Sequence, residues 1–372
     1  MTEGAPNRLR LARTEGVGPV AYRRLLSRFG TAVAALDALP GLARAGGRTL
    51  APKTPSLSDI EREIDRLDRL GGRLLFLGDS DYPPLLALLD DAPPVLAVLG
   101  DLACLSQRCV ALVGSRNASV NGSRMADALA WELAKAGLVV VSGLARGIDT
   151  AAHLGALRSG LTVACVAGGI DLPYPAENAD LQRRIARSGC VVAEAPLGTA
   201  PMARHFPRRN RIIAGLSLGV VVVEAAMRSG SLITAHMAQD AGREVYAVPG
   251  SPLDPRARGA NSLLRDGATL TETAQDVLDN LPDAPGPRRL PGLAEEPEGF
   301  DTTAPRDDVQ AAAMQARLVA LIGPAPTAVD DLIRHSQFSA ADVASALLEL
   351  ELAGRIEMMH GNRIALRVPD TN

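Results

Sequence analysis

The residues best suited to chemistry in this 372-residue chain are glycines, serines and arginines that follow short apolar runs. Glycine lets a ligand approach the backbone closely, and the N-terminus of a helix attracts negative charge. One such loop is often only a tight turn, but several at the same end of a sheet predict a phosphate-binding site. The candidate residues in three of these loops are Gly114, Ser115, Arg116, Ser142, Gly143, Arg146, Gly147, Gly168 and Gly169.

A basic cluster follows between Ala203 and Arg211, where four arginines occur with no acidic residue among them. Guanidinium groups bind phosphate through paired hydrogen bonds, and an aromatic ring beside them suits the stacking of a nucleobase. Composition alone leaves a second interpretation open, in which the cluster is a solvated loop and Phe206 belongs to the core. The candidate contacts in this cluster are Arg204, His205, Phe206, Arg209, Asn210 and Arg211.

Known catalytic motifs are missing from the sequence. It has no P-loop of the form G-x-x-x-x-G-K-[ST], no G-x-G-x-x-G after the first strand of the expected sheet, and neither H-E-x-x-H nor G-x-S-x-G. Glu194 and Glu224 end two apolar runs, and we expect them to accept hydrogen bonds from loop amides. His153 lies in an alanine-rich helix and is expected to be structural. The sequence therefore predicts no catalytic residue, no metal and no cofactor.

The bulk composition is that of ordinary globular domains, with 47% hydrophobic and 22% charged residues. The net charge of -3 argues weakly against a nucleic-acid partner, although a binding groove needs only local positive charge. The four cysteines form no C-x-x-C pair, so we expect reduced thiols and a cytoplasmic location. No apolar stretch reaches the ~20 residues of a membrane helix, so no membrane contact is expected.

The elements that would position these groups alternate regularly in the middle of the chain. Continuous apolar strands separated by helices are typical of a parallel sheet covered on both faces. We therefore predict an α/β fold, a Rossmann-like doubly wound and mostly parallel sheet, over residues 73–281. Strands are expected at 109–113, 138–141, 162–166, 191–193, 219–223 and 244–248, and helices at 121–136, 149–159, 179–188, 210–216 and 231–241.

A smaller domain is expected before this sheet. Residues 1–72 are predicted to form a helical domain of the helix-hairpin-helix or SAM-like kind, because Gly16-Val17-Gly18 lies between two helices. Such a turn can offer backbone amides to a DNA phosphate. A plain helical packing module is the alternative, since this pattern is common between helices.

Another small domain is expected at the C-terminal end. Residues 282–308 are predicted to be a proline-rich acidic linker. Residues 309–368 show three helices and a strand pair, which is the layout of a winged helix. Its third helix is acidic, so we expect a protein contact rather than the reading of bases in the major groove.

Long motifs in a fixed order resemble those of the DprA/Smf family, the DNA-processing proteins of natural transformation. The resemblance covers residues 75–280, and family members with both accessory domains match the flanking parts. The motifs include Ser142-Gly143-Leu144-Ala145-Arg146-Gly147-Ile148-Asp149, Phe206-Pro207-Arg208-Arg209-Asn210-Arg211 and Ser229-Gly230-Ser231-Leu232-Ile233-Thr234.

This resemblance implies a non-enzymatic homodimer that binds single-stranded DNA. Such a protein protects incoming DNA, loads the RecA recombinase onto it and helps to overcome single-strand binding protein. By position, Arg116 would hold a phosphate, Phe206 would stack a base, and residues 261–270 would join two copies. The family often has a lysine at the position of Ala203, so the charge is expected at the neighbouring Arg204. The implied DNA site also includes Ser229, Gly230 and Ser231.

Two other functions stay open at this point. A Rossmann-like phosphoribohydrolase that acts on nucleoside monophosphates would show P-G-G-x-G-T-x-x-E, but the nearest segment, 230–234, is followed by Met237 where that glutamate belongs. The second of these functions is that of a scaffold that binds proteins through its winged helix. Base release from a mononucleotide would favour the first, and DNA binding that survives removal of residues 285–372 would count against the second.

Overall fold

The computed structural model describes residues 4–283, 308–323, 325–359 and 361–367. The chain divides into two compact units, of which one is Glu63–Arg288 and the other combines Met1–Arg62 with Arg289–Asn372. Most of the expected linker at 282–308 lies outside the described residues.

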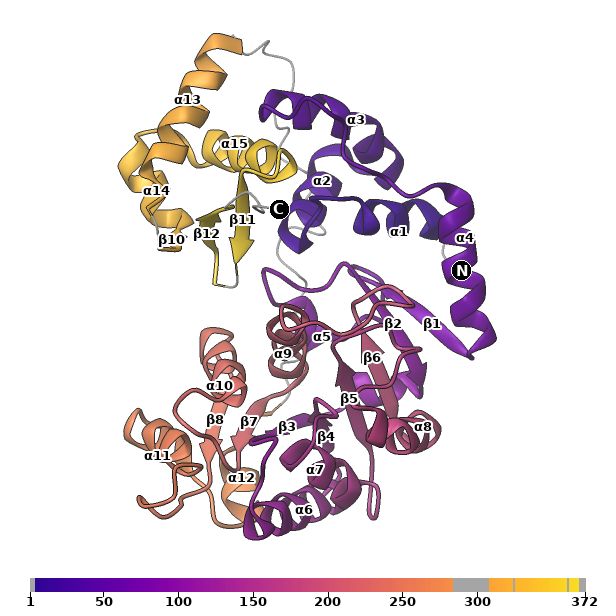
Figure 1. Ribbon diagram of the computed structural model, residues 1–372, viewed down its shortest axis with the longest axis vertical. Coiled ribbons are helices and arrows are strands. Elements are labelled where there is room, and N and C mark those ends of the chain that lie inside the picture. Colours follow the sequence, from indigo (N-terminus) through magenta and orange to yellow (C-terminus); the bar gives the residue numbers. More distant parts are fainter. Residues whose placement is uncertain (1–3, 284–307, 324, 360, 368–372) are drawn as a thin grey trace. The chain divides into compact units, whose positions relative to one another are not determined.

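The larger unit is built on a nine-stranded sheet in the order β1-β2-β6-β5-β4-β3-β7-β8-β9 (Figure 1). The pairs β1–β2 and β2–β6 are antiparallel, and all other neighbours are parallel, which confirms the predicted mostly parallel sheet. The strands are β1 (Gly72–Phe76), β2 (Val95–Gly100), β3 (Cys109–Val113), β4 (Val139–Ser142), β5 (Thr162–Val166), β6 (Cys190–Ala193), β7 (Gly219–Val222), β8 (Glu244–Ala247) and β9 (Thr269–Leu270).

Helices cover both faces of this sheet, and so every residue of β3, β4, β5 and β7 is buried. On one face α6, α7 and α12 share an apolar core with Leu112 and Val140, and on the other α9 packs over β3, β4 and β5 (Figure 1). The helices of this unit are α5 (Pro84–Ala87), α6 (Val120–Lys135), α7 (Ile148–Ala156), α8 (Ala179–Ser188), α9 (His205–Leu216), α10 (Gly230–Asp240), α11 (Arg258–Arg265) and α12 (Ala274–Asn280).

The largest difference from the expected elements is the start of α9. This helix begins at His205 rather than at residue 210, so most of the basic cluster forms its first two turns instead of a preceding loop. Pro207 favours a loop in the sequence, but proline is tolerated in the first turn of a helix, where backbone amides have no helical partner. The sequence also does not predict α11, α12 and β9, because each is too short to show a clear periodicity.

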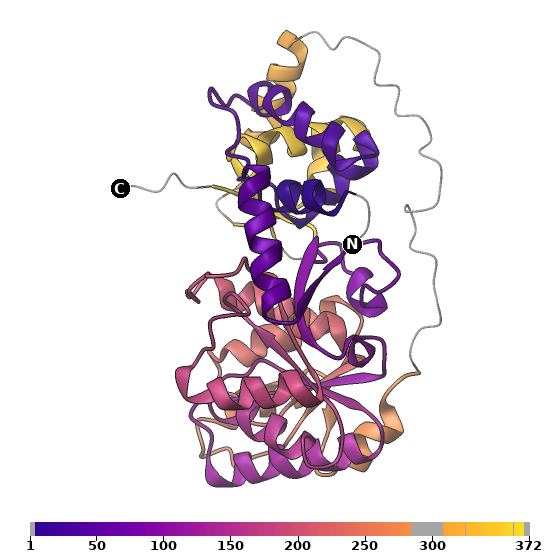
Figure 2. The ribbon, with the colours of Figure 1, turned by 90° about the vertical axis from the view of Figure 1, so that its right-hand side faces the viewer.

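The smaller unit joins the two ends of the chain. Figures 1 and 2 both show the indigo helices α1–α3 beside the yellow α15, and Leu348 and Leu352 of α15 belong to the apolar core of those helices. Helix α4 (Leu57–Arg69) continues into the larger unit. The other elements are α1 (Ala5–Arg13), α2 (Pro19–Phe29), α3 (Ala32–Ala45), α13 (Asp308–Leu321), α14 (Val329–Ser336), α15 (Ala340–Leu352), β10 (Thr327–Ala328), β11 (Ile356–Met359) and β12 (Arg363–Leu366).

The glycine turn between α1 and α2 is covered by α15. A β-carbon on Gly16 would lie 3.5 Å from the carbonyl oxygen of Leu352, and one on Gly18 would lie 3.0 Å from Glu351 Oε1. Residues 346–352 of α15 are buried in turn. The turn is therefore packed against α15, and this part of α15 offers no surface for reading bases.

Candidate nucleic-acid interface

The order of the strands reverses at β3. The strands that follow β3 in the chain, β4 to β6, lie on one side of it, whereas β7, β8 and β9 lie on the other. In open α/β sheets, ligands bind in the crevice at the carboxyl ends of the strands beside such a point. A hollow of about 800 Å³ occupies this position, lined by the loop after β3, by α9 and by the start of α10.

The hollow brings together only part of the predicted set. The residues that line it are Gly114, Ser115, Arg116, Phe206, Arg209, Asn210, Ser229, Gly230 and Ser231. Those that do not line it are Ser142, Gly143, Arg146, Gly147, Gly168, Gly169, Arg204, His205 and Arg211. The loop after β3 and the start of α10 therefore contribute directly, and the loops after β4 and β5 act mainly as supports.

Arg116 is an exposed cation in the lining of the hollow. Its guanidinium carbon lies 4.7 Å from the centroid of the half-buried Phe206 ring, within the range of a cation–π contact. Such a contact contributes about 0.5–1 kcal/mol at an exposed site, less than the roughly 1.5–3 kcal/mol of a hydrogen bond to a charged group. No carboxylate pairs with Arg116 in the described part of the chain. A phosphate can therefore draw this side chain away from the ring.

The loop that carries Arg116 is held by its neighbours. Ser115 Oγ accepts the amide of Asn117 at 3.1 Å, and the carbonyl oxygen of Ser115 accepts the amide of Ile148 at 3.2 Å. Gly147 has a φ of 75°, and a β-carbon there would lie 2.3 Å from the same carbonyl oxygen. Gly147 thus permits the close approach of the two loops.

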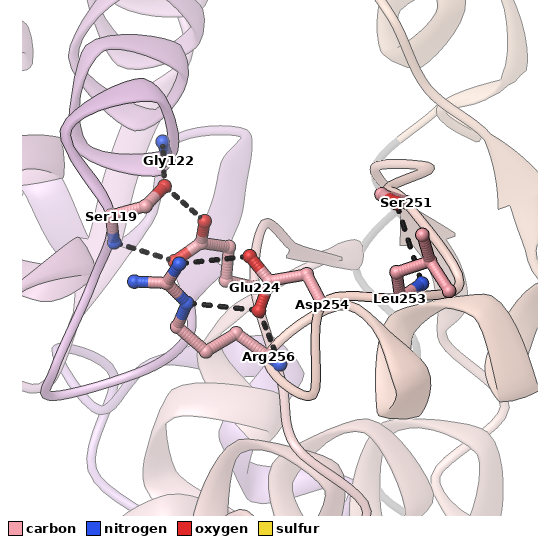
Figure 3. A network of polar contacts seen from close by, with 7 residues as sticks. All are labelled: Ser119, Gly122, Glu224, Ser251, Leu253, Asp254 and Arg256. Carbon is pink, nitrogen blue, oxygen red and sulfur yellow. Dashed lines mark hydrogen bonds and ion pairs between the residues drawn. The ribbon is translucent and has the colours of Figure 1, made fainter.

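A carboxylate joins the end of β7 to the start of α6 (Figure 3). Glu224, which follows β7, accepts the amide of Ser119 at 2.9 Å and the Ser119 hydroxyl, and Ser119 Oγ accepts the amide of Gly122 at 2.8 Å. The guanidinium of Arg256 lies beside Glu224 and pairs with Asp254 at 2.8 Å. The expectation that Glu224 accepts a loop amide is confirmed.

Two buried residues of opposite charge, Asp149 and Arg209, form the floor of the hollow. Asp149 accepts the amides of Gly143 at 3.1 Å and Ala145 at 3.2 Å, and Arg209 Nη1 donates to the carbonyl oxygen of Cys165 at 3.1 Å. Burial raises the pKa of Asp149, and the positive charge of Arg209 opposes that rise. Gly143 has no room for a side chain, because a β-carbon would lie 1.5 Å from Arg209 Nη1. Arg209 therefore lies beneath Phe206 as a support.

Arg211 is an internal residue and does not line the hollow, unlike the phosphate contact that the sequence predicts. Its side chain is 5% exposed, and its Nη2 donates to Glu194 at 2.5 Å. This ion pair neutralises the charge that a phosphate would need. Glu194 therefore pairs with an arginine, whereas a loop amide was the expected donor.

The other residues outside the lining have local roles. Arg146 is exposed and pairs with Glu177 at 2.9 Å, and Arg204 is exposed at the residue before α9. His205 Nδ1 accepts the amide of Met202 at 3.2 Å. The hydroxyl of Ser142 donates to the carbonyl oxygen of Leu112 at 2.7 Å. Gly168 and Gly169 pack closely, since a β-carbon on either would lie 2.7 Å from a carbonyl oxygen, of Thr199 and Pro196 respectively.

His153 is structural, as expected. Its Nδ1 lies 2.7 Å from the hydroxyl of Thr162, which itself donates to the carbonyl oxygen of Val140. Because that hydroxyl proton is already used, His153 must donate through Nδ1. Burial lowers its pKa to about 3, so the ring is neutral.

The start of α10 adds donors to the hollow. Ser229 caps this helix by accepting the amide of Ser231 at 3.3 Å, and Asn210 Nδ2 donates to the carbonyl oxygen of Gly230 at 3.2 Å. The free amides of a first helical turn attract an anion. The exposed Arg228 precedes this turn and also lines the hollow, although the sequence reasoning missed it. The sequence feature that could have predicted this contact is the position of Arg228 directly before Ser229.

Tyr174 is the second lining residue that the sequence reasoning missed. Its ring centroid lies 5.9 Å from that of Phe206. The sequence feature that could have predicted Tyr174 is its position between two prolines, in a chain with few aromatic residues. The hollow thus combines two aromatic rings, exposed arginines and a helix N-terminus, a set suited to a ligand with both phosphates and flat rings.

Three further features describe the chemistry of the chain. Its four cysteines are buried and free, and burial raises the pKa of the Cys104 thiol to about 11. The described residues contain no group of three or more His, Cys, Asp or Glu side chains that could hold a metal ion. No helix in the described ranges is both long and apolar enough to cross a membrane.

Comparison with known proteins agrees with this organisation. The family model for DNA recombination-mediator protein A matches residues 73–282, that for the DprA-like N-terminal HHH domain matches 3–65, and that for the DprA winged helix domain matches 302–362. Protein Smf of Escherichia coli K12 is 38% identical over 310 residues, which are 83% of this chain and 81% of that protein.

Two solved structures are similar to the chain. The X-ray structure of DNA processing protein A from Streptococcus pneumoniae has a TM-score of 0.59 and 41% identity, and covers 62% of this chain and 80% of its own. DNA processing protein A from Helicobacter pylori, whose structure concerns its single-stranded DNA binding mode, has a TM-score of 0.51 and 30% identity over 56% of this chain and 95% of its own. Together with the family models, these similarities show that the chain belongs to the DprA/Smf family of DNA-processing proteins.

Proposed function

We propose that the hollow beside β3 and β7 binds single-stranded DNA and that the protein does so without breaking bonds. The observation that carries the proposal is the guanidinium of Arg116 over the ring of Phe206, with no carboxylate partner among the residues that the structure describes. A strand brings phosphates for the cation and unpaired bases for the ring. The binding mode of the Helicobacter pylori relative supports the same ligand class.

The proposed cellular role is recombination mediation. In this role the protein protects incoming single strands and passes them from single-strand binding protein to the RecA recombinase. The family description as a recombination mediator supports it. The role is tested in a reaction that contains RecA, ATP and DNA coated with single-strand binding protein. The wild-type protein should shorten the lag before RecA hydrolyses ATP, and the Arg116→Ala variant should not shorten it. An equal lag with and without the protein would overturn the role.

We also propose that two copies associate through the late part of the larger unit. The predicted surface at residues 261–270 lies beside a second hollow of about 440 Å³, lined in part by Asn261, Leu264 and Arg265. Leu270 on the edge strand β9 is 51% exposed, and Leu253 is 89% exposed. Exposed apolar side chains near a sheet edge suit an association of identical chains.

The DNA-binding proposal is tested by fluorescence anisotropy with labelled single-stranded and duplex oligonucleotides. Wild-type protein should prefer the single strand, and Arg116→Ala should weaken that binding while the protein stays folded. Arg183→Ala is the matched control, because Arg183 is an exposed arginine on α8 that does not line the hollow. Equal affinity of wild type and Arg116→Ala would overturn the assignment of the site.

A further inference from the structure

Tyr174 differs from the other tyrosines of the chain. Of the four tyrosines, Tyr22, Tyr82 and Tyr246 are at most 4% exposed, whereas Tyr174 is 50% exposed. A single exposed ring is ordinary on a protein surface, so exposure alone decides nothing. This ring, however, lines the hollow and lies beside Phe206.

The loop that carries Tyr174 is fixed at both ends. After the ring, Asn178 Nδ2 donates to the carbonyl oxygen of Leu144 and to the hydroxyl of Thr150, both at 2.9 Å. Before it, Gln182 Nε2 donates to the carbonyl oxygen of Ile170 at 2.8 Å. Because the loop is already ordered, a ligand that contacts the ring loses little affinity to the ordering of this segment.

The tyrosine hydroxyl has no hydrogen-bond partner within the described part of the chain. Internal hydrogen bonding therefore does not account for a tyrosine at this place, and the half-exposed ring contacts Phe206. The ring offers a flat face instead, and a flat face beside cations is the usual binding surface for an unpaired base.

The geometry of the two rings limits how they can act. Their centroids are 5.9 Å apart and their planes are inclined by 59°. A base held between two rings needs parallel faces separated by about 7 Å, twice a van der Waals contact. The pair is therefore too close and too inclined to enclose one base. Each ring can stack its own base if a strand turns as it passes the hollow.

We propose that Tyr174 stacks a nucleobase next to the one that stacks on Phe206, so that the hollow binds a dinucleotide step of single-stranded DNA. The inference rests on the proposed DNA-binding function and adds a contact to it. It also supplies a basis for strand selection, because the bases of a duplex are stacked on one another and do not expose their faces to two side chains.

Substitution of Tyr174 tests the inference. Tyr174→Ala should lower the affinity for oligo(dT) by about 5- to 100-fold and leave duplex affinity unchanged. Tyr174→Phe should restore the affinity, because stacking uses the ring and not the hydroxyl. Leu172→Ala is the matched control, since Leu172 is 39% exposed on the same loop and does not line the hollow. An equal loss in Leu172→Ala would show that the loop and not the ring matters, and would overturn the inference.

A fluorescence reporter tests stacking directly. Trp131 is the only tryptophan of the chain and lies on α6 outside the hollow, so Trp131→Phe combined with Tyr174→Trp places the sole indole at the proposed contact. Saturation with oligo(dT) should quench this indole. Unchanged fluorescence at saturation, or full affinity of Tyr174→Ala, would overturn the inference and leave the proposed function intact. Failure of the wild-type protein to bind single strands would instead overturn the proposed function.

Discussion

Glu224 Oε2 accepts the backbone amide of Ser119 at 2.9 Å, which joins the end of β7 to the start of α6. Neither residue lines the hollow, yet the loop between β3 and α6 carries Ser115 and Arg116 into it. The position of Arg116 thus depends on a carboxylate that follows the neighbouring strand β7.

Removal of this carboxylate should therefore weaken DNA binding indirectly. In Glu224→Ala the Ser119 amide and the loop before it lose their partner, and we expect a loss of about 1–3 kcal/mol in the free energy of unfolding and weaker binding of oligo(dT). Denaturant titration and anisotropy measure the two effects. Glu132→Ala, at an exposed acid on α6, is the control. Unchanged affinity in Glu224→Ala would show that the loop does not need this bond.

Gly143→Ala should strongly destabilise the larger unit. Its β-carbon would lie 1.5 Å from Arg209 Nη1, so the buried guanidinium must move away from Asp149. An uncompensated buried charge costs about 3–5 kcal/mol. Thermal unfolding followed by circular dichroism measures the loss. Gly230→Ala, where a β-carbon meets nothing within 4 Å, is the steric control, and equal stability of both variants would contradict the packing described for the floor.

The salt dependence of binding should report on Arg116. Each phosphate contact adds about 0.7 to the slope of log affinity against log salt concentration for a single strand. Arg116→Ala should reduce that slope by roughly one contact, and Arg183→Ala should not. Anisotropy titrations across a salt series measure both slopes. The same slope in wild type and Arg116→Ala would mean that this guanidinium neutralises no phosphate.

The smaller unit should lose stability as pH rises. Burial raises the pKa of Glu351 to about 7, with Arg24 opposing the rise and Glu357 adding to it. An acid with a raised pKa keeps its proton longer in the folded state, so stability falls from the unfolded pKa near 4.5 up to about pH 7 and then levels off. Denaturation between pH 5 and pH 8 should show a decrease of at most about 3 kcal/mol. Glu351→Gln should remove most of that slope, and a slope equal to that of the wild type would contradict this.

The proposed association of two copies should be sensitive to charge at β9. Leu270→Arg places a cation on each facing surface and should shift the protein toward monomers in sedimentation velocity. Leu154→Arg, at a 38% exposed leucine on α7, is the control and should sediment like the wild type. A wild-type protein that stays monomeric at micromolar concentration would contradict the proposal.

Much of the sheet could be predicted because β3 is a run of five buried apolar residues and β5 has four such residues after Thr162, both between clear turns. The roles of Arg209 and Arg211 could not, because both look like surface cations in the sequence. The acidic residues near them, Asp149 in the first turn of α7 and Glu194 just after β6, come close to them only in the fold. Tyr174 was missed for the same reason, since its proximity to Phe206 depends on how its loop meets the start of α9.

The central claim is that the bases of a single strand stack in the hollow beside Arg116. Ultraviolet cross-linking of oligonucleotides that carry 5-iododeoxyuridine, followed by peptide mass spectrometry, tests it most directly. We predict cross-links to the peptide that contains Phe206, lost in Phe206→Ala. Cross-links confined to peptides outside the hollow, with none on that peptide at saturating DNA, would contradict the claim.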